Sequence, residues 1–356
     1  KFKIISSLYF LTLIIFISNN LFSQITGSIK GVVRDSASGE MLPFVSIQVV
    51  GTKIGTVTNN NGLYFLKGIP KGYQTIQASA VGYKKITKKI IIEKEEIQTV
   101  NFNLPSEAVE LQSVTKIADR IIENYSTNIS LQKISIEDMK SIPSVLEKDI
   151  FRALRSVPGV STTGDVTSQF FVRGGKGDQN LIIYDNMIIF NPFHALGLFS
   201  IFDAEAIKSS EIYTGGFDPE FGGKLSSVIN ITSKDGNRNK YGGKVSLGTL
   251  STSASFEGPL PGGSFYLSGR KSVFNSILKK LLKKDVPLSF YDISGKATLD
   301  MSEAGKISLN SFFSGDNLDA SKPTDPEFKW RTSAIGVNLQ SIFSQVLITT
   351  NFSYSD

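Results

Sequence analysis

The chain has 356 residues, no cysteine and one histidine, His194, and its formal net charge of +6 comes from 38 basic and 32 acidic residues. The lack of thiols excludes disulfides, thiolate metal sites and cysteine nucleophiles, and a single imidazole excludes a multi-histidine zinc or di-iron centre. The basic residues form no long tract, so the charge does not indicate a nucleic-acid partner, and the length suggests two or three domains.

Residues 1–23 have the pattern of a secretory signal peptide. Lys1 and Lys3 precede an apolar run from Ile4 to Ile17, and polar residues then lead to the small residue Ser23, where cleavage is expected. A membrane anchor is the alternative, but a spanning helix needs about 20 apolar residues and this run is shorter. The pattern therefore predicts an exported chain.

Residues 25–105 predict a small β-sandwich of about seven short strands. Ile29–Arg34 alternates and ends at a polar turn, Asn59–Gly62 supplies a tight turn, and Gln98–Leu104 reads as the last strand. The motifs that carry a family resemblance are Gly31-Val32-Val33-Arg34-Asp35, Ile69-Pro70-Lys71-Gly72 and Val81-Gly82-Tyr83. They resemble the carboxypeptidase regulatory-like domain, a transthyretin-like sandwich without catalytic machinery. This resemblance, and the absence of histidine from the segment, predict that the chain is not an enzyme.

Residues 106–130 are polar and weakly patterned, and they predict a linker. Within it lies the run Glu110-Leu111-Gln112-Ser113-Val114-Thr115. This run resembles the TonB box, an extended segment that pairs edge to edge with a strand of the TonB protein. Its alternation suits such pairing because backbone hydrogen bonds supply most of the affinity.

Residues 131–237 predict a compact α/β domain. Asp149–Ser156 carries apolar residues at helical spacing, and the proline and glycine of Val157–Val160 end that helix. Strands are expected at Gln169–Val172, Leu181–Asp185 and Val228–Thr232.

Three stretches of this domain resemble the plug of a TonB-dependent outer-membrane receptor. They are Phe171–Gly175, Asn191–His194 and Gly215–Gly223. The resemblance implies plug–barrel contact by Arg173, Gly174, Gly175, Gly215, Gly216, Gly222 and Gly223, with Arg173 paired to barrel-wall carboxylates. It also implies ligand-facing loops that carry Asp178, Gln179, Asn180, Asn191 and His194. No cofactor or metal site is expected.

Plainer alternatives accompany these assignments. Arg173–Gly177 lacks the spacing of a phosphate-binding loop and lies between strands rather than before a helix. His194 has no partner set for catalysis, so a satisfied structural histidine is the alternative to a ligand contact. Arg173 can also be read as a plain surface arginine.

Residues 240–356 alternate with a period of two and predict about seven strands of an antiparallel outer-membrane β-barrel. In the best example Tyr291, Ile293, Leu299 and Met301 fall on one face, while polar residues between them fall on the other. An ordinary antiparallel sandwich is the alternative, but tight and long connections take turns, as they do in barrels. Since single-chain barrels have even strand counts, we expect an incomplete barrel, and the resemblance implies one of 22 strands.

The overall prediction is therefore a multi-domain chain: sandwich, linker, α/β plug and the first strands of a truncated barrel. The resemblance implies ligand-gated, TonB-energised import of a siderophore, cobalamin, glycan or peptide across the outer membrane of a Gram-negative bacterium. The partners implied are TonB with its inner-membrane proton-driven complex, outer-membrane lipid, an extracellular ligand and a surface lipoprotein, with the N-terminal domain in the periplasm. An outer-membrane signalling receptor and a structural or adhesive surface protein are the alternatives.

Overall fold

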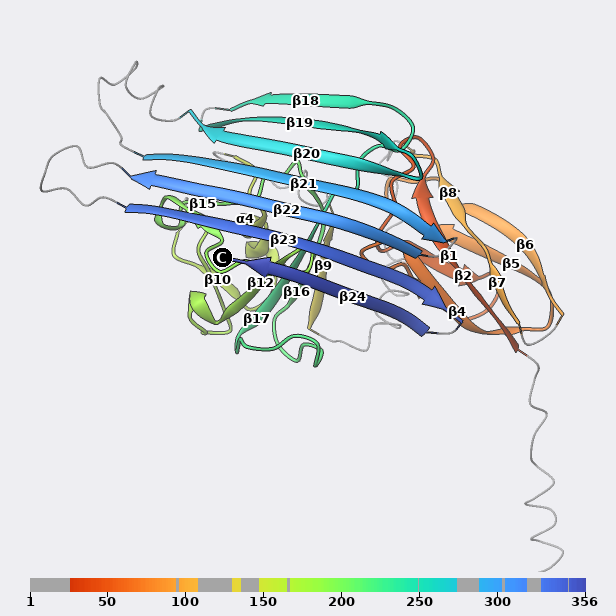
Figure 1. The fold of residues 1–356 in the computed structure, drawn as a ribbon. Helices are drawn as coiled ribbons and strands as arrows, with labels where there is room; N and C mark the ends of the chain where they lie inside the picture. The colour runs from red at the N-terminus through yellow and green to blue at the C-terminus, as the bar shows by residue number, and fades with distance from the viewer. Residues whose placement is uncertain are drawn as a thin grey trace, which may run out of the picture.

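The computed structural model describes residues 26–93, 96–107, 130–135, 147–164, 167–248, 250–273, 288–302, 305–318, 328–344 and 346–356. The predicted signal peptide and TonB box lie outside these residues. Three parts follow one another along the described chain (Figure 1): an N-terminal sandwich, a central domain and a seven-stranded sheet.

The N-terminal sandwich consists of two facing sheets. One has the order β4–β1–β7, with β8 also paired to β1, and the other has the order β3–β2–β5–β6. The strands are β1 (Thr26–Asp35), β2 (Ser46–Val49), β3 (Gly55–Val57), β4 (Leu63–Pro70), β5 (Gly72–Ser79), β6 (Ile86–Ile92), β7 (Ile97–Thr99) and β8 (Phe102–Leu104). Alternate side chains such as Ile29, Ile47, Ile76 and Phe102 are buried between the sheets, as the period of two requires.

The predicted last strand of the sandwich, Gln98–Leu104, is interrupted. It forms β7 and β8, which both run parallel to β1. Between them the side-chain oxygen of Asn101 accepts a hydrogen bond from the backbone N–H of Val32 at 2.8 Å. The side chain thus takes the place of a backbone partner, and the ladder restarts after it.

The central domain is built on a five-stranded sheet of order β13–β12–β17–β16–β9. Its strands and short helices are β9 (Leu131–Ser135), α4 (Ile150–Ala153), η1 (Leu154–Ser156), β10 (Val160–Thr162), β11 (Phe170–Val172), η2 (Gly177–Gln179), β12 (Asn180–Tyr184), β13 (Met187–Ile188), β14 (Phe193–His194), η3 (Ala195–Gly197), β15 (Phe199–Ser200), β16 (Ile207–Tyr213) and β17 (Ser227–Ser233). The predicted helix is confirmed as α4 continued by η1. Asp149 caps it by accepting from the N–H groups of Phe151 and Arg152.

Among the described residues, no helix is long and apolar enough to cross a membrane.

The seven-stranded sheet is antiparallel and takes its strands in chain order. They are β18 (Gly242–Leu247), β19 (Ser251–Leu260), β20 (Gly263–Ser272), β21 (Leu288–Ser302), β22 (Gly305–Leu318), β23 (Phe328–Phe343) and β24 (Val346–Ser355). The predicted strand count is confirmed and the barrel is not closed. The predicted alternation is also confirmed, because Met301 is 59% exposed while its polar neighbour in the pattern, Thr298, is 0% exposed.

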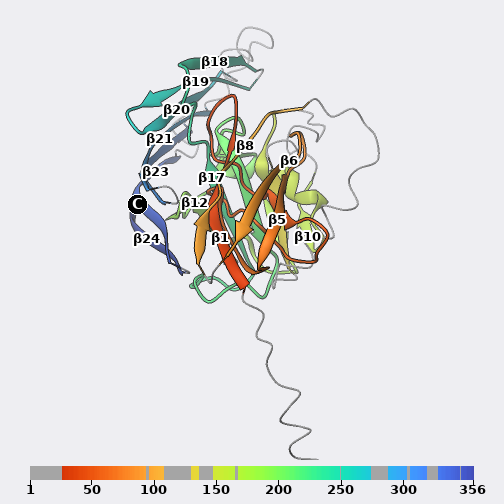
Figure 2. The same ribbon diagram turned by 90° about the vertical axis from the view of Figure 1, so that its right-hand side faces the viewer.

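The seven-stranded sheet curves around the central domain (Figure 2), and its polar face is turned toward that domain. The sandwich lies at the end of the sheet where the short connections β21–β22 and β23–β24 are found (Figure 1). The outward face carries exposed apolar side chains such as Ile293, Leu309 and Phe352. The wall of the sheet therefore has one apolar side and one polar side, and the polar side holds the candidate site.

Candidate functional site between the central domain and the sheet

A small apolar patch joins the central core to the sheet. Phe312 and Ala334 of the sheet are buried within the hydrophobic core of the central domain. The ring of Phe312 lies 5.1 Å from that of Tyr184 and 5.6 Å from that of Phe202, centroid to centroid. A second apolar patch packs Ala195 and Phe199 of the central domain against Phe290 of the sheet. Most other buried groups on this face of the sheet are polar or charged, so the contact is mainly polar outside these two patches.

The first charge cluster, which we call the histidine cluster, is centred on His194 of β14. The imidazole is 0% exposed and is stacked on Phe290 at a centroid distance of 4.2 Å. Its Nδ1 lies 2.7 Å from Oδ2 of Asp316, and its Nε2 lies 2.7 Å from Oδ1 of Asp292. Two aspartates from β21 and β22 therefore hold one side chain of the central domain.

The geometry of the histidine cluster requires a protonated ring. A carboxylate only accepts hydrogen bonds, so both ring nitrogens must donate, and only the imidazolium does so. Burial opposes protonation, but the carboxylates of Asp292 and Asp316 outweigh it, and the pKa of His194 is raised above its ordinary value. Arg270 also faces this cluster: its Nε donates to Oδ2 of Asp292 at 2.8 Å, and its Nη2 donates to the carbonyl of Ser200 at 2.7 Å.

The second charge cluster, the lysine cluster, is centred on Asp235, just after β17. Its carboxylate is approached by Lys208 Nζ at 2.6 Å, Lys296 Nζ at 3.1 Å and Lys306 Nζ at 3.4 Å. Lys296 also lies 3.0 Å from Oδ1 of Asp185. Burial opposes ionisation of Asp235, but the three lysines outweigh it and hold its pKa well below the usual range.

Gly236 follows Asp235 and brings the backbone of the central domain against the sheet. Its φ is +87°, and a Cβ at this position would lie 2.0 Å from the carbonyl oxygen of Phe265 in β20. Only glycine fits both the conformation and the space. This close approach positions the Asp235 carboxylate among the lysines.

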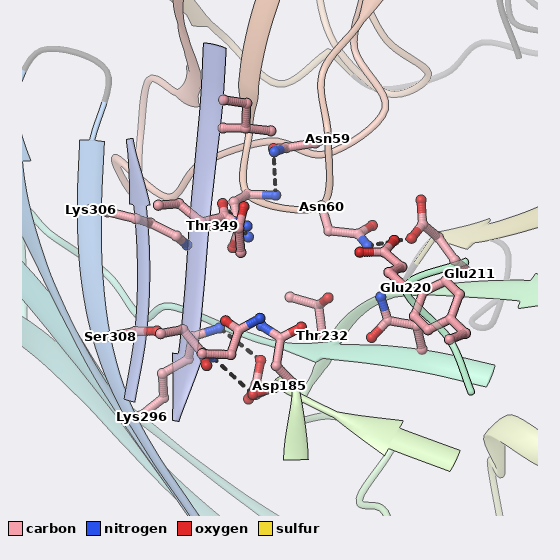
Figure 3. A pocket seen from close by; sticks show the side chains of 18 residues that line it. Asn59, Asn60, Asp185, Glu211, Glu220, Thr232, Lys296, Lys306, Ser308 and Thr349 are labelled. Atoms are coloured by element: carbon pink, nitrogen blue, oxygen red, sulfur yellow. Dashed lines mark hydrogen bonds and ion pairs between the residues drawn. The ribbon is translucent and has the colours of Figure 1, made fainter. Parts of the chain in front are cut away.

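A cavity of about 220 Å³ lies beside the lysine cluster, where all three parts of the chain meet (Figure 3). The sandwich contributes its Asn59–Asn61 turn, the central domain contributes Asp185 and Glu211, and the sheet contributes residues that include Lys306. Asn60 Nδ2 donates to Glu211 Oε2 at 2.6 Å. Burial raises the pKa of Glu211, and the nearby charge of Lys133 only partly opposes this.

The predicted plug–barrel contact residues make their described contacts within the central domain. Arg173 is exposed, and its guanidinium donates to Thr214 Oγ1 at 3.2 Å, which is a contact within the central domain. A Cβ on Gly175 would meet Ser226 and one on Gly215 would meet Arg173, again within this domain. No described atom lies within 4 Å of a Cβ placed on Gly174, Gly222 or Gly223, and only Ser130 approaches Gly216. Their predicted contact with the barrel stays a prediction.

The predicted ligand-facing residues divide into two groups. Asp178 is exposed, and Gln179 and Asn191 are partly exposed, so these three remain candidates. Asn180 is buried and accepts from Ser227 Oγ at 2.7 Å. His194 is buried between the two aspartates, as the alternative of a satisfied structural histidine describes, and its ligand-facing role stays a prediction.

The sequence analysis did not identify the residues that join the central domain to the seven-stranded sheet, because their partners are distant in sequence. They are Asp185, Lys208, Asp235, Gly236, Arg270, Asp292, Lys296, Lys306 and Asp316. One signal was available: charged residues within the alternating strands, such as Asp292 and Lys296, fall on the polar face. No group of three or more histidine, aspartate or glutamate side chains in the described ranges could hold a metal ion.

Comparison with known proteins identifies two domains in the chain. Residues 29–115 match the CarboxypepD_reg-like domain, and residues 123–228 match the TonB-dependent Receptor Plug Domain. A search of curated proteins finds no match.

Several solved structures are similar to the chain. The siderophore receptor PirA from Acinetobacter baumannii is 19% identical with a TM-score of 0.47, over 64% of this chain and 40% of that one. A mutant of the ferric enterobactin receptor PfeA from Pseudomonas aeruginosa is 15% identical with a TM-score of 0.47, over 65% and 41%. The outer membrane transporter YddB from Escherichia coli is 13% identical with a TM-score of 0.48, over 64% and 38%. The chain thus spans about two fifths of the length of these proteins.

Proposed function

Because the chain carries a TonB-dependent receptor plug domain behind a CarboxypepD_reg-like domain, we propose that it works in ligand-gated, TonB-energised import across the outer membrane of a Gram-negative bacterium. In this proposal the central domain is the plug, the seven-stranded sheet is part of the surrounding barrel, and the N-terminal sandwich lies in the periplasm. In this proposal the ligand is a nutrient of the siderophore, cobalamin, glycan or peptide class, and a surface lipoprotein is a further partner.

The observation that carries the proposal is the way the plug domain is fastened. Its contact with the polar face of the sheet depends on the histidine and lysine clusters, with two small apolar patches. Buried charges are stable only while they are paired, yet they are well hydrated once water reaches them. Such a contact is firm at rest and can be opened by a mechanical pull without exposing a large apolar surface.

The energy for opening is proposed to enter through Glu110–Thr115. TonB pairs with this segment and pulls it, and the pull is transmitted to the plug. Ligand binding outside and TonB binding inside then bias one plug equilibrium, which couples two distant sites. Leu111 and Val114 are the side chains of the segment that we expect to matter most.

The test compares wild type with Val114→Pro in the intact receptor, with labelled iron chelates, cobalamin, glycans and peptides as probes. Proline removes a backbone donor from the strand that TonB pairs with, so one probe should accumulate in wild-type cells and only bind at the surface of the mutant. Asp119→Pro, in the predicted linker between the box and the segment that matches the plug domain, is the matched control. Equal behaviour of wild type and Val114→Pro on every probe, at equal surface levels, would rule out the TonB-box assignment and favour a signalling or adhesive role.

A further inference from the structure

One surface of the sandwich contacts both the central domain and the sheet. The turn after β1 is closed by the Asp35 side chain, which accepts from the N–H groups of Ala37 and Ser38 at 2.8 and 2.7 Å. Its carbonyl groups face the segment that leads from the central domain into the sheet. Ser38 accepts from the N–H of Arg238 at 2.7 Å, and Ala37 accepts from Asn239 Nδ2 at 2.9 Å.

The same turn reaches the lysine cluster. Glu40 Oε1 accepts from the backbone N–H of Asp235 at 2.8 Å, directly beside the carboxylate that the three lysines approach. This contact satisfies a backbone donor at the close approach of Gly236 to the sheet. The sandwich therefore contributes an acceptor to a junction that otherwise consists of the central domain and the sheet.

An ion-pair triad joins all three parts next to this turn. Asp300, near the end of β21, is held by both guanidinium nitrogens of Arg238, at 2.6 and 3.0 Å. Arg34 of the sandwich also donates to Asp300, through Nη2 at 3.0 Å. One carboxylate of the sheet thus binds an arginine from each of the other two parts. The bidentate Arg238–Asp300 pair is strong and directional, so it orients the carboxylate to which Arg34 of the sandwich donates.

A second seam lies on the other side of the cavity. Asn60 donates to Glu211 of the central domain, and Asn61 Nδ2 donates to Gln340 Oε1 of β23 at 2.7 Å. Lys30 Nζ donates to the carbonyl of Ile342 at 3.1 Å, and the Ile342 side chain is packed in an apolar cluster with Val32, Met41 and Leu63 of the sandwich. The interface of the sandwich therefore contains both hydrogen bonds and apolar contacts. It extends over the central domain and the seven-stranded sheet.

We propose that the N-terminal sandwich is a clamp that holds the plug against the barrel wall from the side of the short connections, and that it must undock before the plug moves. The clamp proposal rests on the import function only for the biological role of the clamp, because the docking contacts themselves do not depend on import. The sandwich can make its contacts only when Arg238, Asp235 and Asp300 lie next to one another. It therefore binds the closed plug with a higher affinity than a displaced plug. A domain with such a difference in affinity shifts the equilibrium toward the closed state.

These 356 residues contain no cysteine, so a cysteine pair introduced here reports the docking once any cysteine elsewhere in the receptor is replaced by serine. In the purified intact receptor, Asn61→Cys combined with Gln340→Cys is treated with a short bis-methanethiosulfonate reagent. Thr87→Cys on the exposed side of β6, combined with Gln340→Cys, is the matched control pair. We expect the first pair to cross-link at least about tenfold more than the second, because docking holds the two sites at high effective concentration. Equal cross-linking of the two pairs would overturn the docking.

The clamp itself is measured as potassium chloride conductance through the receptor in a planar lipid bilayer while urea is raised to displace the plug. The cross-linked receptor is expected to open at a higher urea concentration than the uncross-linked one, and a reductant that cleaves the bridge should abolish the difference. Arg34→Ala, which removes the sandwich arginine but leaves the Arg238–Asp300 pair, should open at a lower concentration. Identical opening in all of these forms would show that the sandwich docks without clamping.

This readout needs neither TonB nor an identified ligand. If the conductance experiment shows no clamp, the import proposal is unaffected. If the Val114→Pro uptake test fails, the conductance result is unaffected.

Discussion

The two charge clusters that fasten the plug are opposite in design. In the histidine cluster one cation of the plug, His194, lies between two aspartates of the wall, and Arg270 of the wall balances them. In the lysine cluster one anion of the plug, Asp235, is approached by three lysines, two of which belong to the wall. Each cluster therefore depends on a plug residue at its centre. Removal of His194 leaves excess negative charge on the wall, whereas removal of Asp235 leaves excess positive charge there.

The largest effect is expected from Asp235→Asn, which removes the centre of the lysine cluster. Lys296 then keeps its ion pair with Asp185, but Lys208 and Lys306 lose the carboxylate that they approach. The loss of one partner from a buried ion pair typically costs about 3–5 kcal/mol. The free energy of unfolding, measured by urea titration in detergent micelles, should fall by about this amount. The exposed Asp218→Asn is the matched control and should change stability by less than about 0.5 kcal/mol. A small loss for Asp235→Asn would mean that water already reaches the lysines.

The backbone contact that supports the lysine cluster is tested by Gly236→Ala. A left-handed backbone disfavours alanine, and its Cβ would collide with the carbonyl oxygen of Phe265, so the two effects together should cost about 2–4 kcal/mol. Gly262→Ala is the control, because Gly262 has a φ of +75° but open space at its Cβ position. Urea unfolding of both variants separates the steric clash from the conformational cost. Equal losses would show that the close approach does not matter.

The histidine cluster should make stability depend on pH in a defined direction. The pKa of His194 is raised in the folded chain, so its stabilising contribution is present below the unfolded value of about 6.5 and is lost as pH rises through the folded value. The loss amounts to about 1.4 kcal/mol for each unit by which the pKa is raised. Subtraction of the pH profile of His194→Gln from that of wild type isolates this contribution. A difference that stays flat above pH 6.5 would contradict protonation of His194 between the aspartates.

Much of the fold could be predicted because its signals are local. The alternation from Tyr291 to Met301 predicts which side chains share a face. The spacing of tight and long connections indicates roughly where the seven strands begin and end. The apolar spacing and the proline of residues 149–158 likewise predict the helix formed by α4 and η1 and its end, whereas the Asp149 cap was found only in the structure. The split of Gln98–Leu104 into β7 and β8 could not be predicted in this way, since it depends on a hydrogen bond between Asn101 and Val32, which is distant in the chain.

The sequence alone determined the order of the domains and the polar face of each strand, because periodicity and turn chemistry act over a few residues. It also singled out His194, and the barrel contact that the resemblance assigns to Arg173 stays a prediction. Only the tertiary structure decided which charges meet: His194 and Asp316 are 122 positions apart, and Lys306 and Asp235 are 71 apart. Alternation tells which way a side chain points, whereas its partner is set by the curvature of the sheet and by the packing of the plug on Phe312. Since a buried charge is stable only with that partner, the site became visible only after the three parts were assembled.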